Sequence, residues 1–370
     1  MAIVSAPFGK EYCDEWVKQA KEYDQSKMGV KGLLDSGVTT IPSIFTHPSE
    51  DLNDLKPSSR NLEIPIIDLS MMINDRLKIA HQIKESFSSW GFFQVINHGI
   101  PIQVIEETIK AFKCFHEEPM IKDRYVWDEK VSYYSNFNIF KSKAVNWKDS
   151  LRVLTSPNPP EKETIPNVCR KELMAWDEYM KSLCETLMEL MCEGLGVSSN
   201  RLKELSCLQM RKLLCHSYPY CPQPDLTMGL PTHTDRGLLT LLLQNEVSGL
   251  QVKYDDEWVE VKPIPGAIIV NVGDLLQIIS NDQFKSVEHR VLANPYKEPR
   301  ISVAVIFNPG KCDESDYYGP LPELLSQENP GLYRNFTIPE ILGHEQTDNC
   351  VKIIVDLCKI SGQGIEEIAN

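Results

Sequence analysis

The chain has 370 residues, of which 42% are apolar, and this is enough for one large domain or two small ones with a sizeable core. Its formal net charge of −14 argues against a nucleic-acid partner, because binding to phosphates requires a basic surface. The sequence contains no run of about 18 apolar residues, so it predicts no transmembrane helix and no membrane partner.

The first half of the chain is predicted to form an arm and a supporting region. Residues 1–60 are polar and rich in turns, and we interpret them as an N-terminal arm with a helix around 15–23. Region 61–205 alternates strand-like and helix-like segments. Its predicted elements are strands at 64–69 and 92–96 and helices that begin after Asn74 or Asp75, at Pro101 and at about Lys171. The last helix presents one apolar stripe and ends at two glycines.

Residues 206–370 are predicted to form the core domain. Short strands follow one another there with turns, and without helices, between them. The predicted strands are 212–218, 238–244, 250–254, 257–262, 267–272, 275–280, 288–293 and 300–308. This pattern favours a mainly β fold with a double-stranded β-helix (jelly roll) core backed by helices. A C-terminal helix within 348–360 is expected over the mouth or the outer wall of the barrel.

A His-Thr-Asp sequence indicates a metal site. Residues two apart on an extended strand point to the same side, so His233 and Asp235 can bind one ion together while Thr234 points into the wall. His289, in a later predicted strand, is a suitable third ligand. Two imidazoles and one carboxylate form the facial triad of non-haem Fe(II) oxygenases, which leaves the opposite face open. The chain has eight histidines, so a lone His-x-Asp would be weak evidence, but the ordered set predicts a metal centre.

An anion-binding pair follows the third histidine. Arg300 and Ser302 lie two apart on one predicted strand, where they offer a guanidinium fork and a hydroxyl to a carboxylate. Tyr218, on the strand before the metal loop, is the candidate for a second hydroxyl. A 2-oxo acid that chelates a metal through one end needs such a cation for its far carboxylate.

Several longer stretches carry a family pattern. They are 64–69, 90–99, 218–225, 231–242, 273–281, 285–291 and 300–307. Together they run from about residue 60 to the end, and they resemble the plant 2-oxoglutarate/Fe(II)-dependent dioxygenases of specialised metabolism. In the arm, 29–38 and 41–45 resemble a narrower subgroup, that of the deacetoxyvindoline 4-hydroxylase-like enzymes and the aminocyclopropane-carboxylate oxidase homologues.

This resemblance implies the cofactors and the reaction. It implies ligands for Fe(II) at His233, Asp235 and His289 and for 2-oxoglutarate at Tyr218, Arg300 and Ser302. O2 is then the second cosubstrate, ascorbate is the expected reductant, and succinate and CO2 are released. The implied activity is hydroxylation of a small-molecule substrate.

Three positions need comment beside this resemblance. His216 stands where the family usually has an asparagine, so the hydrogen bonding around it stays open. Asp282 stands where a glycine is common, at a turn that tolerates Asp. His98, in an Asn-His-Gly sequence, belongs to the supporting region in the family, and we interpret it as structural.

The substrate pocket is expected to be apolar. Its candidate residues are Phe137, Leu214, Ile306 and Phe307. Such a lining suits a bulky, largely apolar plant metabolite, of the alkaloid, steroidal alkaloid, benzoxazinoid or phenylpropanoid class. The acidic net charge favours a neutral or cationic substrate over a phosphorylated one.

Cysteine usage and the N-terminus bear on the compartment. The 11 cysteines include no Cys-x-x-Cys pair, which is typical of reduced thiols and not of a disulfide framework or a zinc site. Residues 1–21 lack the apolar segment of a secretory signal. We therefore expect a cytoplasmic protein, and we expect a monomer.

Other functions remain open from the sequence. The same machinery can desaturate, demethylate or close rings. An ascorbate-dependent oxidase keeps a similar triad and arginine-serine pair, so succinate production discriminates the two. A catalytically silent small-molecule binder has no need of an intact triad and clamp, and a zinc hydrolase leaves Arg300 and Ser302 unexplained.

Overall fold

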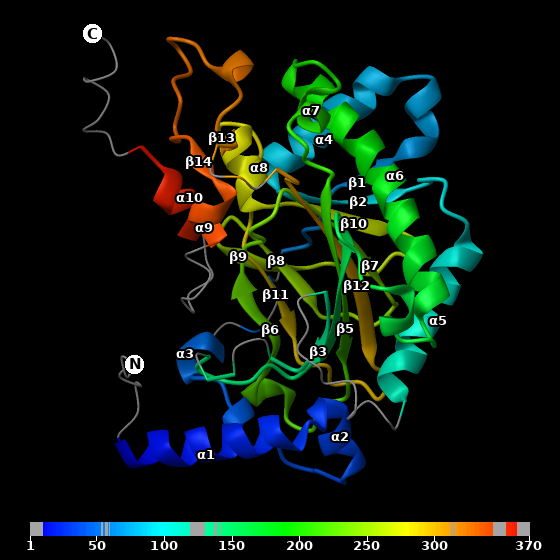
Figure 1. Cartoon of the computed structure of the whole chain (residues 1–370), viewed down its shortest axis with the longest axis vertical. Coiled ribbons are helices and arrows are strands. Elements are labelled where there is room, and N and C mark those ends of the chain that lie inside the picture. Colours follow the sequence, from blue (N-terminus) through cyan, green and yellow to red (C-terminus); the bar gives the residue numbers. More distant parts are fainter. Residues whose placement is uncertain are drawn as a thin grey trace.

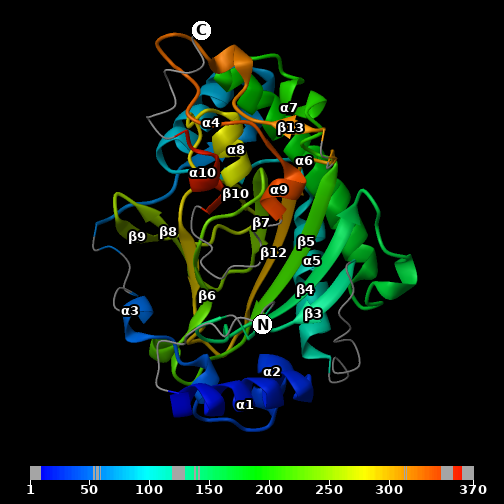
Figure 2. The same ribbon diagram turned by 60° about the vertical axis from the view of Figure 1, so that its left-hand side comes forward.

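The structure of the chain, a computed structural model, describes residues 10–52, 55, 58, 60–118, 130–136, 139–140, 142–311, 313, 315–342 and 353–360. Two β-sheets face each other, and helices pack on the outer side of the larger sheet (Figures 1 and 2). We call them the major sheet and the minor sheet. The predicted mainly β fold with flanking helices is confirmed.

The major sheet has eight strands in the order β1-β2-β10-β7-β12-β5-β4-β3. They are β1 (Ile66–Asp68), β2 (Phe92–Ile96), β3 (Val131–Tyr134), β4 (Asp149–Ser156), β5 (Met210–Tyr218), β7 (Leu239–Gln244), β10 (Ile268–Val272) and β12 (Arg300–Asn308). Early and late strands are neighbours, because β2 pairs with β10 and β4 pairs with β5. The regions that the sequence divides near residue 205 therefore share one sheet.

The minor sheet has four strands in the order β6-β11-β8-β9. They are β6 (Met228–His233), β8 (Leu250–Tyr254), β9 (Glu257–Glu260) and β11 (His289–Leu292). Asp255 and Asp256 join β8 to β9 with φ angles of 47° and 62°, the left-handed conformation that a two-residue hairpin turn requires. The segments predicted as strands at 250–254 and 257–262 thus form a tight hairpin. A separate pair, β13 (Tyr317–Tyr318) and β14 (Phe336–Thr337), lies outside both sheets.

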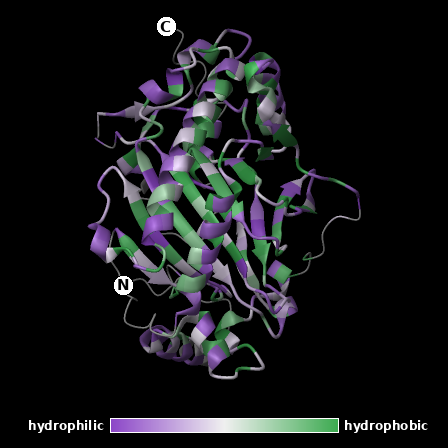
Figure 3. Ribbon diagram, turned by 90° about the vertical axis from the view of Figure 1, so that its right-hand side faces the viewer, coloured by the Kyte–Doolittle hydropathy of each residue, from purple (hydrophilic) through white to green (hydrophobic). Residues whose placement is uncertain are grey.

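The two faces of the major sheet have different surroundings. On β12, Ile301, Val303 and Val305 are buried in the main hydrophobic core, whereas Arg300 and Ser302 point to the opposite face, because strand residues alternate. We call this opposite face, which is turned toward the minor sheet, the inner face. Figure 3 shows hydrophobic residues gathered along the central strands.

Helices cover the outer face of the major sheet. The three long ones are α4 (Arg76–Ser89), α5 (Ile102–Glu117) and α6 (Arg170–Leu195). α6 buries an apolar stripe that includes Trp176 and Met180, and it ends at Gly196, whose φ of 78° suits a helix C-cap. Leu77 of α4 is 77% exposed and lies outside the buried stripe that contains Ile79, Ile83 and Phe87.

The N-terminal arm wraps one end of the two sheets (Figure 1). It contains α1 (Lys10–Ser26), α2 (Gly29–Asp35), the 3-10 helix η1 (Ser43–Phe45) and α3 (Ser49–Leu52). Its apolar side chains, such as Ala20 and Phe45, form a second core cluster with Trp147 and Ala293 from the rest of the chain. The arm therefore packs directly against both the supporting strands and the later part of the chain.

The segment predicted as a strand at 275–280 is a helix, α8 (Asp274–Ile279). All six of its residues are buried, and a short apolar run of this kind does not distinguish a strand from a buried helix. α10 (Ile353–Cys358) packs beside α8, so the C-terminal helix lies at the outside of the barrel (Figure 1). The remaining short helices are η2 (Leu69–Ile73), η4 (Lys162–Thr164), α7 (Arg201–Glu204), η5 (Pro224–Leu226), η6 (Pro322–Leu324) and α9 (Ile338–Leu342). In the described part of the chain no helix has the length and apolarity to span a bilayer.

Candidate active site

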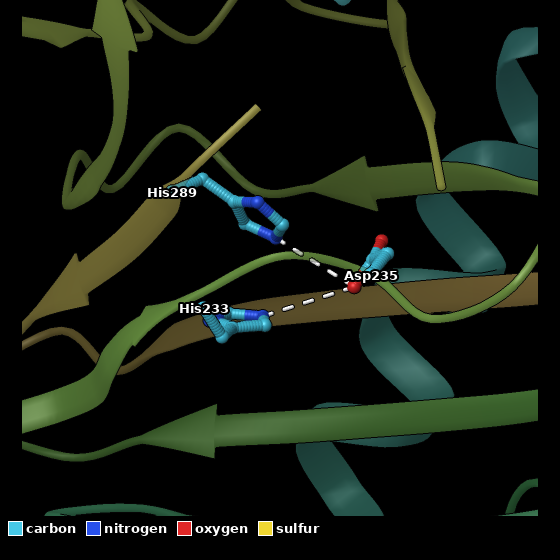
Figure 4. Close-up of side chains that lie close together, drawn as sticks. All are labelled: His233, Asp235 and His289. Atoms are coloured by element: carbon cyan, nitrogen blue, oxygen red, sulfur yellow. Dashed lines mark ion pairs between the residues drawn. The ribbon is translucent and has the colours of Figure 1, made fainter. Parts of the chain in front are cut away.

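Two histidines lie side by side on neighbouring strands of the minor sheet (Figure 4). β6 ends at His233 and β11 begins at His289, and the two residues are cross-strand partners. Their ring centroids are 4.1 Å apart. Because directly opposite residues on paired strands project to the same face, both imidazoles point toward one position.

Asp235 joins this pair from the loop that follows β6. Its Oδ1 lies 3.8 Å from Nε2 of His233 and 3.7 Å from Nε2 of His289. Its Oδ2 accepts hydrogen bonds from Thr240 Oγ1 at 2.6 Å and from Asn271 Nδ2 at 2.8 Å. These two donors fix the carboxylate so that Oδ1 faces the imidazoles.

The sequence interpretation placed His233 and Asp235 on one strand, and this is wrong in detail. The strand ends at His233, and the chain turns before Asp235. Thr234 is buried between them, and its hydroxyl donates to Asp274 Oδ2 at 3.2 Å. The side chain of Thr234 thus points away from the two histidines into the protein interior, as the sequence predicts.

Backbone carbonyls select the tautomer of each histidine. Nδ1 of His233 lies 2.9 Å from the carbonyl oxygen of Pro231, and Nδ1 of His289 lies 3.2 Å from that of Val287. A carbonyl can only accept a hydrogen bond, so Nδ1 carries the proton in both rings. The lone pair of each Nε2 is then available to a metal ion.

The protonation states suit metal binding. Burial and the neighbouring His289 lower the pKa of His233 to about 3. Burial opposes ionisation of Asp235, but electrostatic interaction with the imidazoles of His289 and His233 and hydrogen bonds from Thr240 and Asn271 outweigh it and lower the pKa of this carboxyl. At neutral pH His233 is therefore neutral and Asp235 is ionised, the forms that bind metals.

The geometry of the three residues fits a divalent ion with open coordination positions. One ligand atom from each of His233, Asp235 and His289 lies within 4.8 Å of the others. Two imidazole nitrogens and one carboxylate oxygen on one side of an ion are the donor set of non-haem Fe(II) sites. The residues present thus fit Fe(II).

A buried arginine lies on the inner face near this group. Arg300 begins β12, is 1% exposed, and is the cross-strand partner of Tyr218 on β5. Its Nη2 donates to Gln244 Oε1 at 2.7 Å, and its Nη1 lies 3.4 Å from Ser302 Oγ. Its Cζ lies 5.0 Å from the centroid of the Tyr218 ring.

Arg300 has no anionic partner among the described residues, and its buried Nε has no hydrogen-bond partner. Arg211, the buried arginine of β5, differs in this respect. Its side chain points to the outer face, where it pairs with Asp177 at 2.7 Å. A buried charge is costly unless it is paired, so the surroundings of Arg300 are complete only when an anion is supplied from outside.

Tyr218 and His216 extend the inner face along β5. Burial raises the pKa of Tyr218 to about 12, against the charge of Arg300 and hydrogen bonding with Ser302, so its hydroxyl stays protonated. His216 lies on the same face, and its Nδ1 is 2.9 Å from Ser150 Oγ on β4. His216 is thus held by a serine of the adjacent strand.

Comparison with known proteins agrees with this geometry. Residues 205–309 match the family described as the 2OG-Fe(II) oxygenase superfamily, and 64–172 match the N-terminal family described as non-haem dioxygenase in morphine synthesis. The 1-aminocyclopropane-1-carboxylate oxidase homolog 1 of Arabidopsis thaliana is 48% identical over 86% of this chain and 90% of its own length. Homolog 6 is 46% identical over 87% and 91%. The chain belongs to the 2OG-Fe(II) oxygenase superfamily.

Solved structures support the same assignment. JOX2, in complex with 2OG, Fe and JA, is 30% identical and superposes with a TM-score of 0.79 over 90% of this chain and 98% of its own. The rice dioxygenase for auxin oxidation is 25% identical, with a TM-score of 0.65 over 76% and 94%. This oxygenase is therefore an oxidoreductase that uses Fe(II) and 2-oxoglutarate, and the jelly-roll fold is confirmed.

The predicted pocket residues of the oxygenase do not all lie together. Leu214 and Ile306 lie on the inner face, where β5 and β12 pair. Phe307 lies on the outer face, fully buried in the main core. Its placement in the pocket is wrong, because it follows Ile306 directly and adjacent strand residues point to opposite faces. Phe137 lies outside the described residues.

The sequence reasoning missed the residues that orient the site. Thr240 and Asn271 hold Asp235, and Gln244 holds Arg300. They are common polar residues within apolar strands. The one signal in the sequence is that they alternate with core residues along their strands, which places them on the inner face. A further omission is Lys148, which is buried beside β4.

His98 is structural, as the sequence analysis interprets it. Its Nε2 lies 2.8 Å from the carbonyl oxygen of Gly266, and its Nδ1 accepts from the backbone N–H of Ile100. Both ring nitrogens thus serve a turn. His98 is absent from the metal-binding group found among the described residues.

Proposed function

We propose that the chain hydroxylates a bulky, largely apolar plant metabolite and couples this to decarboxylation of 2-oxoglutarate, with release of succinate and CO2. His233, Asp235 and His289 hold Fe(II) in this proposal. The bound iron supplies the one-electron chemistry that activates O2. Ascorbate is the expected reductant.

In this proposal the two histidines and the aspartate leave one side of the ion open to the cosubstrates. The carbonyls of Pro231 and Val287 keep the imidazoles oriented, and Thr240 and Asn271 keep the carboxylate oriented. Loss of such outer partners typically weakens metal affinity about 10- to 100-fold. The minor sheet supplies two ligands and the loop after β6 supplies the third.

The observation that carries the cosubstrate assignment is the buried guanidinium of Arg300, which has no anionic partner among the described residues. The far carboxylate of 2-oxoglutarate supplies the missing anion. Ser302 and Tyr218 add hydroxyl donors from the same inner face. Each hydrogen bond to a charged group contributes about 1.5–3 kcal/mol, so this set selects a diacid of matching length.

The substrate class rests on apolar residues and on relatives. Leu214 and Ile306 give the inner face an apolar section beside Tyr218 and Arg300. The rice neighbour is named for oxidation of auxin, and JOX2 was solved with JA bound, which favours a small-molecule substrate here as well. Alkaloids, steroidal alkaloids, benzoxazinoids and phenylpropanoids are the classes we propose to test first.

Mass spectrometry of the products tests the proposal. The purified protein is incubated with Fe(II), ascorbate, 2-oxoglutarate and a plant metabolite extract. We expect succinate in equal amount to a product that is heavier than its substrate by one oxygen atom. Turnover without succinate would overturn the assignment, and a product lacking two hydrogens would indicate a desaturase.

The names of the relatives keep one alternative in view. The matching Arabidopsis proteins are named homologs of 1-aminocyclopropane-1-carboxylate oxidase, which favours testing an ascorbate-dependent oxidase. Such an enzyme turns over without 2-oxoglutarate, so omission of 2-oxoglutarate separates the two. A silent binder would give no product in either assay.

We also propose a cytoplasmic monomer. The eight described cysteines are all free thiols, which suits a reducing compartment. Cell fractionation tests the location, and size-exclusion chromatography tests the oligomeric state.

A further inference from the structure

Lys148 is a buried cation immediately before β4, only 6% exposed. The residues on either side of it point toward the arm. Trp147 packs in the arm cluster. The carboxylate of Asp149 accepts the backbone N–H of Val30 at 3.0 Å and that of Lys31 at 2.9 Å. Lys148 directly precedes Asp149, the first residue of β4, and extending the alternation of β4 by one residue places its side chain on the side opposite to Asp149.

The opposite side is the inner face of the major sheet. Ser150, two residues further, is the cross-strand partner of His216 and contacts its Nδ1. Residues two apart on an extended segment share a side, so Lys148 lies on the face of Ser150 and His216. Burial is the main cause that lowers the pKa of His216, and the charge of Lys148 adds to it.

The ammonium of Lys148 has no hydrogen-bond or ion-pair partner among the described residues. Burial lowers its pKa to about 7, although the charge of Asp149 opposes this. A buried cation without a partner is costly, and an anion brought by a ligand removes that cost. Like Arg300, Lys148 thus has no hydrogen-bonded or ion-paired anion among the residues that the structure describes.

The surrounding strands reinforce this charge. Asp149 is the only acidic residue in β3, β4, β5 and β12, and it is committed to the arm. Arg152 follows Ser150 on the same face of β4. The part of the inner face beside β4 is therefore cationic, even though the chain as a whole carries a net charge of −14.

We propose that Lys148 binds an anionic group of the prime substrate, such as a carboxylate, so that the bulky apolar metabolite is an organic acid. This inference rests on the proposed function. Arg300 on β12 and Lys148 beside β4 lie on opposite sides of strand β5. The cosubstrate anion at Arg300 and the substrate anion at Lys148 are thus bound at separate positions. The apolar body of the substrate then lies along Leu214, on the same inner face.

This assignment replaces the expectation of a neutral or cationic substrate. Net charge averages over the whole surface and does not report the charge of a buried face. Anchoring at Lys148 also restricts which carbon of the substrate approaches the metal ligands, which is the positioning that a selective oxidation requires. Lys148 is thus a specificity-determining residue.

Equilibrium dialysis tests the proposal without turnover. The full chain is loaded with Zn(II) in place of Fe(II) and with 2-oxoglutarate, and is dialysed against a plant metabolite extract before and after esterification of its carboxylic acids. Retained compounds are identified by mass spectrometry. We expect the wild type to retain an acid that is no longer retained after esterification. Retention of that acid should be about 10- to 100-fold weaker in K148M and close to wild type in K148R.

Controls separate the causes of a weakened signal. Lys78 is exposed on α4, and K78M should retain the acid like the wild type. A thermal melt and a 2-oxoglutarate titration of K148M show whether it folds and whether Lys148 belongs instead to the cosubstrate site. Equal weakening of 2-oxoglutarate binding, equal retention by K148M, or retention of no acid by the wild type would overturn the inference.

The Fe(II)-loaded wild type separates this inference from the proposed function. If the retained acid binds through Lys148 but yields no succinate, the proposed hydroxylation is wrong while the anion site stands. If a neutral metabolite is oxidised equally well by the wild type and K148M, the anion site is wrong while the hydroxylation stands.

Discussion

Replacing Arg300 with lysine tests the cosubstrate site directly. Lysine keeps the positive charge but loses the planar fork, of which Nη2 is held by Gln244 and Nη1 approaches Ser302. Loss of one charge-assisted contact to the far carboxylate of 2-oxoglutarate costs about 1.5–3 kcal/mol. At about 1.4 kcal/mol per decade this corresponds to a midpoint for 2-oxoglutarate that is roughly 10- to 150-fold higher.

The assay is an anaerobic titration of the Fe(II) protein with 2-oxoglutarate, followed by visible absorption. Arg211→Lys is the matched control, because Arg211 is also buried but points to the outer face and is paired with Asp177. We expect it to lower the thermal stability and to leave the midpoint near that of the wild type. An unchanged midpoint in R300K, or an equal increase in both variants, would refute the assignment of Arg300.

Three further predictions concern the metal site, the packing and the core. Asp235→Ala should lower iron affinity at least about tenfold, measured as the iron bound to the purified protein. Its circular dichroism spectrum should be unchanged, because Asp235 lies in a loop. A normal iron content would show that Asp235 is not a ligand. Gly229→Ala places a Cβ 2.7 Å from Cδ1 of Tyr218, so we expect the free energy of unfolding, measured in urea, to fall by about 1–3 kcal/mol. An unchanged urea midpoint would contradict this close contact. Burial lowers the pKa of His116 in the folded protein from 6.5 to about 3. As the pH falls from 6.5 toward 3, the unfolded chain therefore binds a proton at His116 that the folded chain does not bind, and the free energy of unfolding decreases. His116→Gln should reduce that fall, and an identical pH dependence would show that His116 does not cause it.

The site residues that carry chemistry could be predicted from the sequence, whereas those that orient them could not. His233, Asp235 and His289 stand out because their types and order are unusual together. Thr240 and Asn271 are ordinary residues in sequence, and they matter only because β7 and β10 are neighbours in the sheet. That adjacency is a long-range property, which local patterns do not contain.

The errors in the sequence analysis have physical causes that differ from case to case. The segment 275–280 is short, and four of its six residues are apolar, so its periodicity could not separate a buried helix from a buried strand. Phe307 was misplaced because its chemistry was considered without the alternation of β12. Lys148 was missed because a single lysine has no signature until the strand beside it is known to be buried.

The sharing of the major sheet between early and late strands limits how the chain can be cut. A fragment that begins at residue 206 would lose β2 and β4, and would expose the pairing edges of β10 and β5. β10 is buried in all five of its residues, four of which are apolar, and an exposed hydrophobic edge strand promotes aggregation through strand addition. The fragment would also lose α5 and α6, which shield the outer face. Expression of residues 206–370 alone should therefore give insoluble material, even though every residue of the metal and cosubstrate sites is present in it.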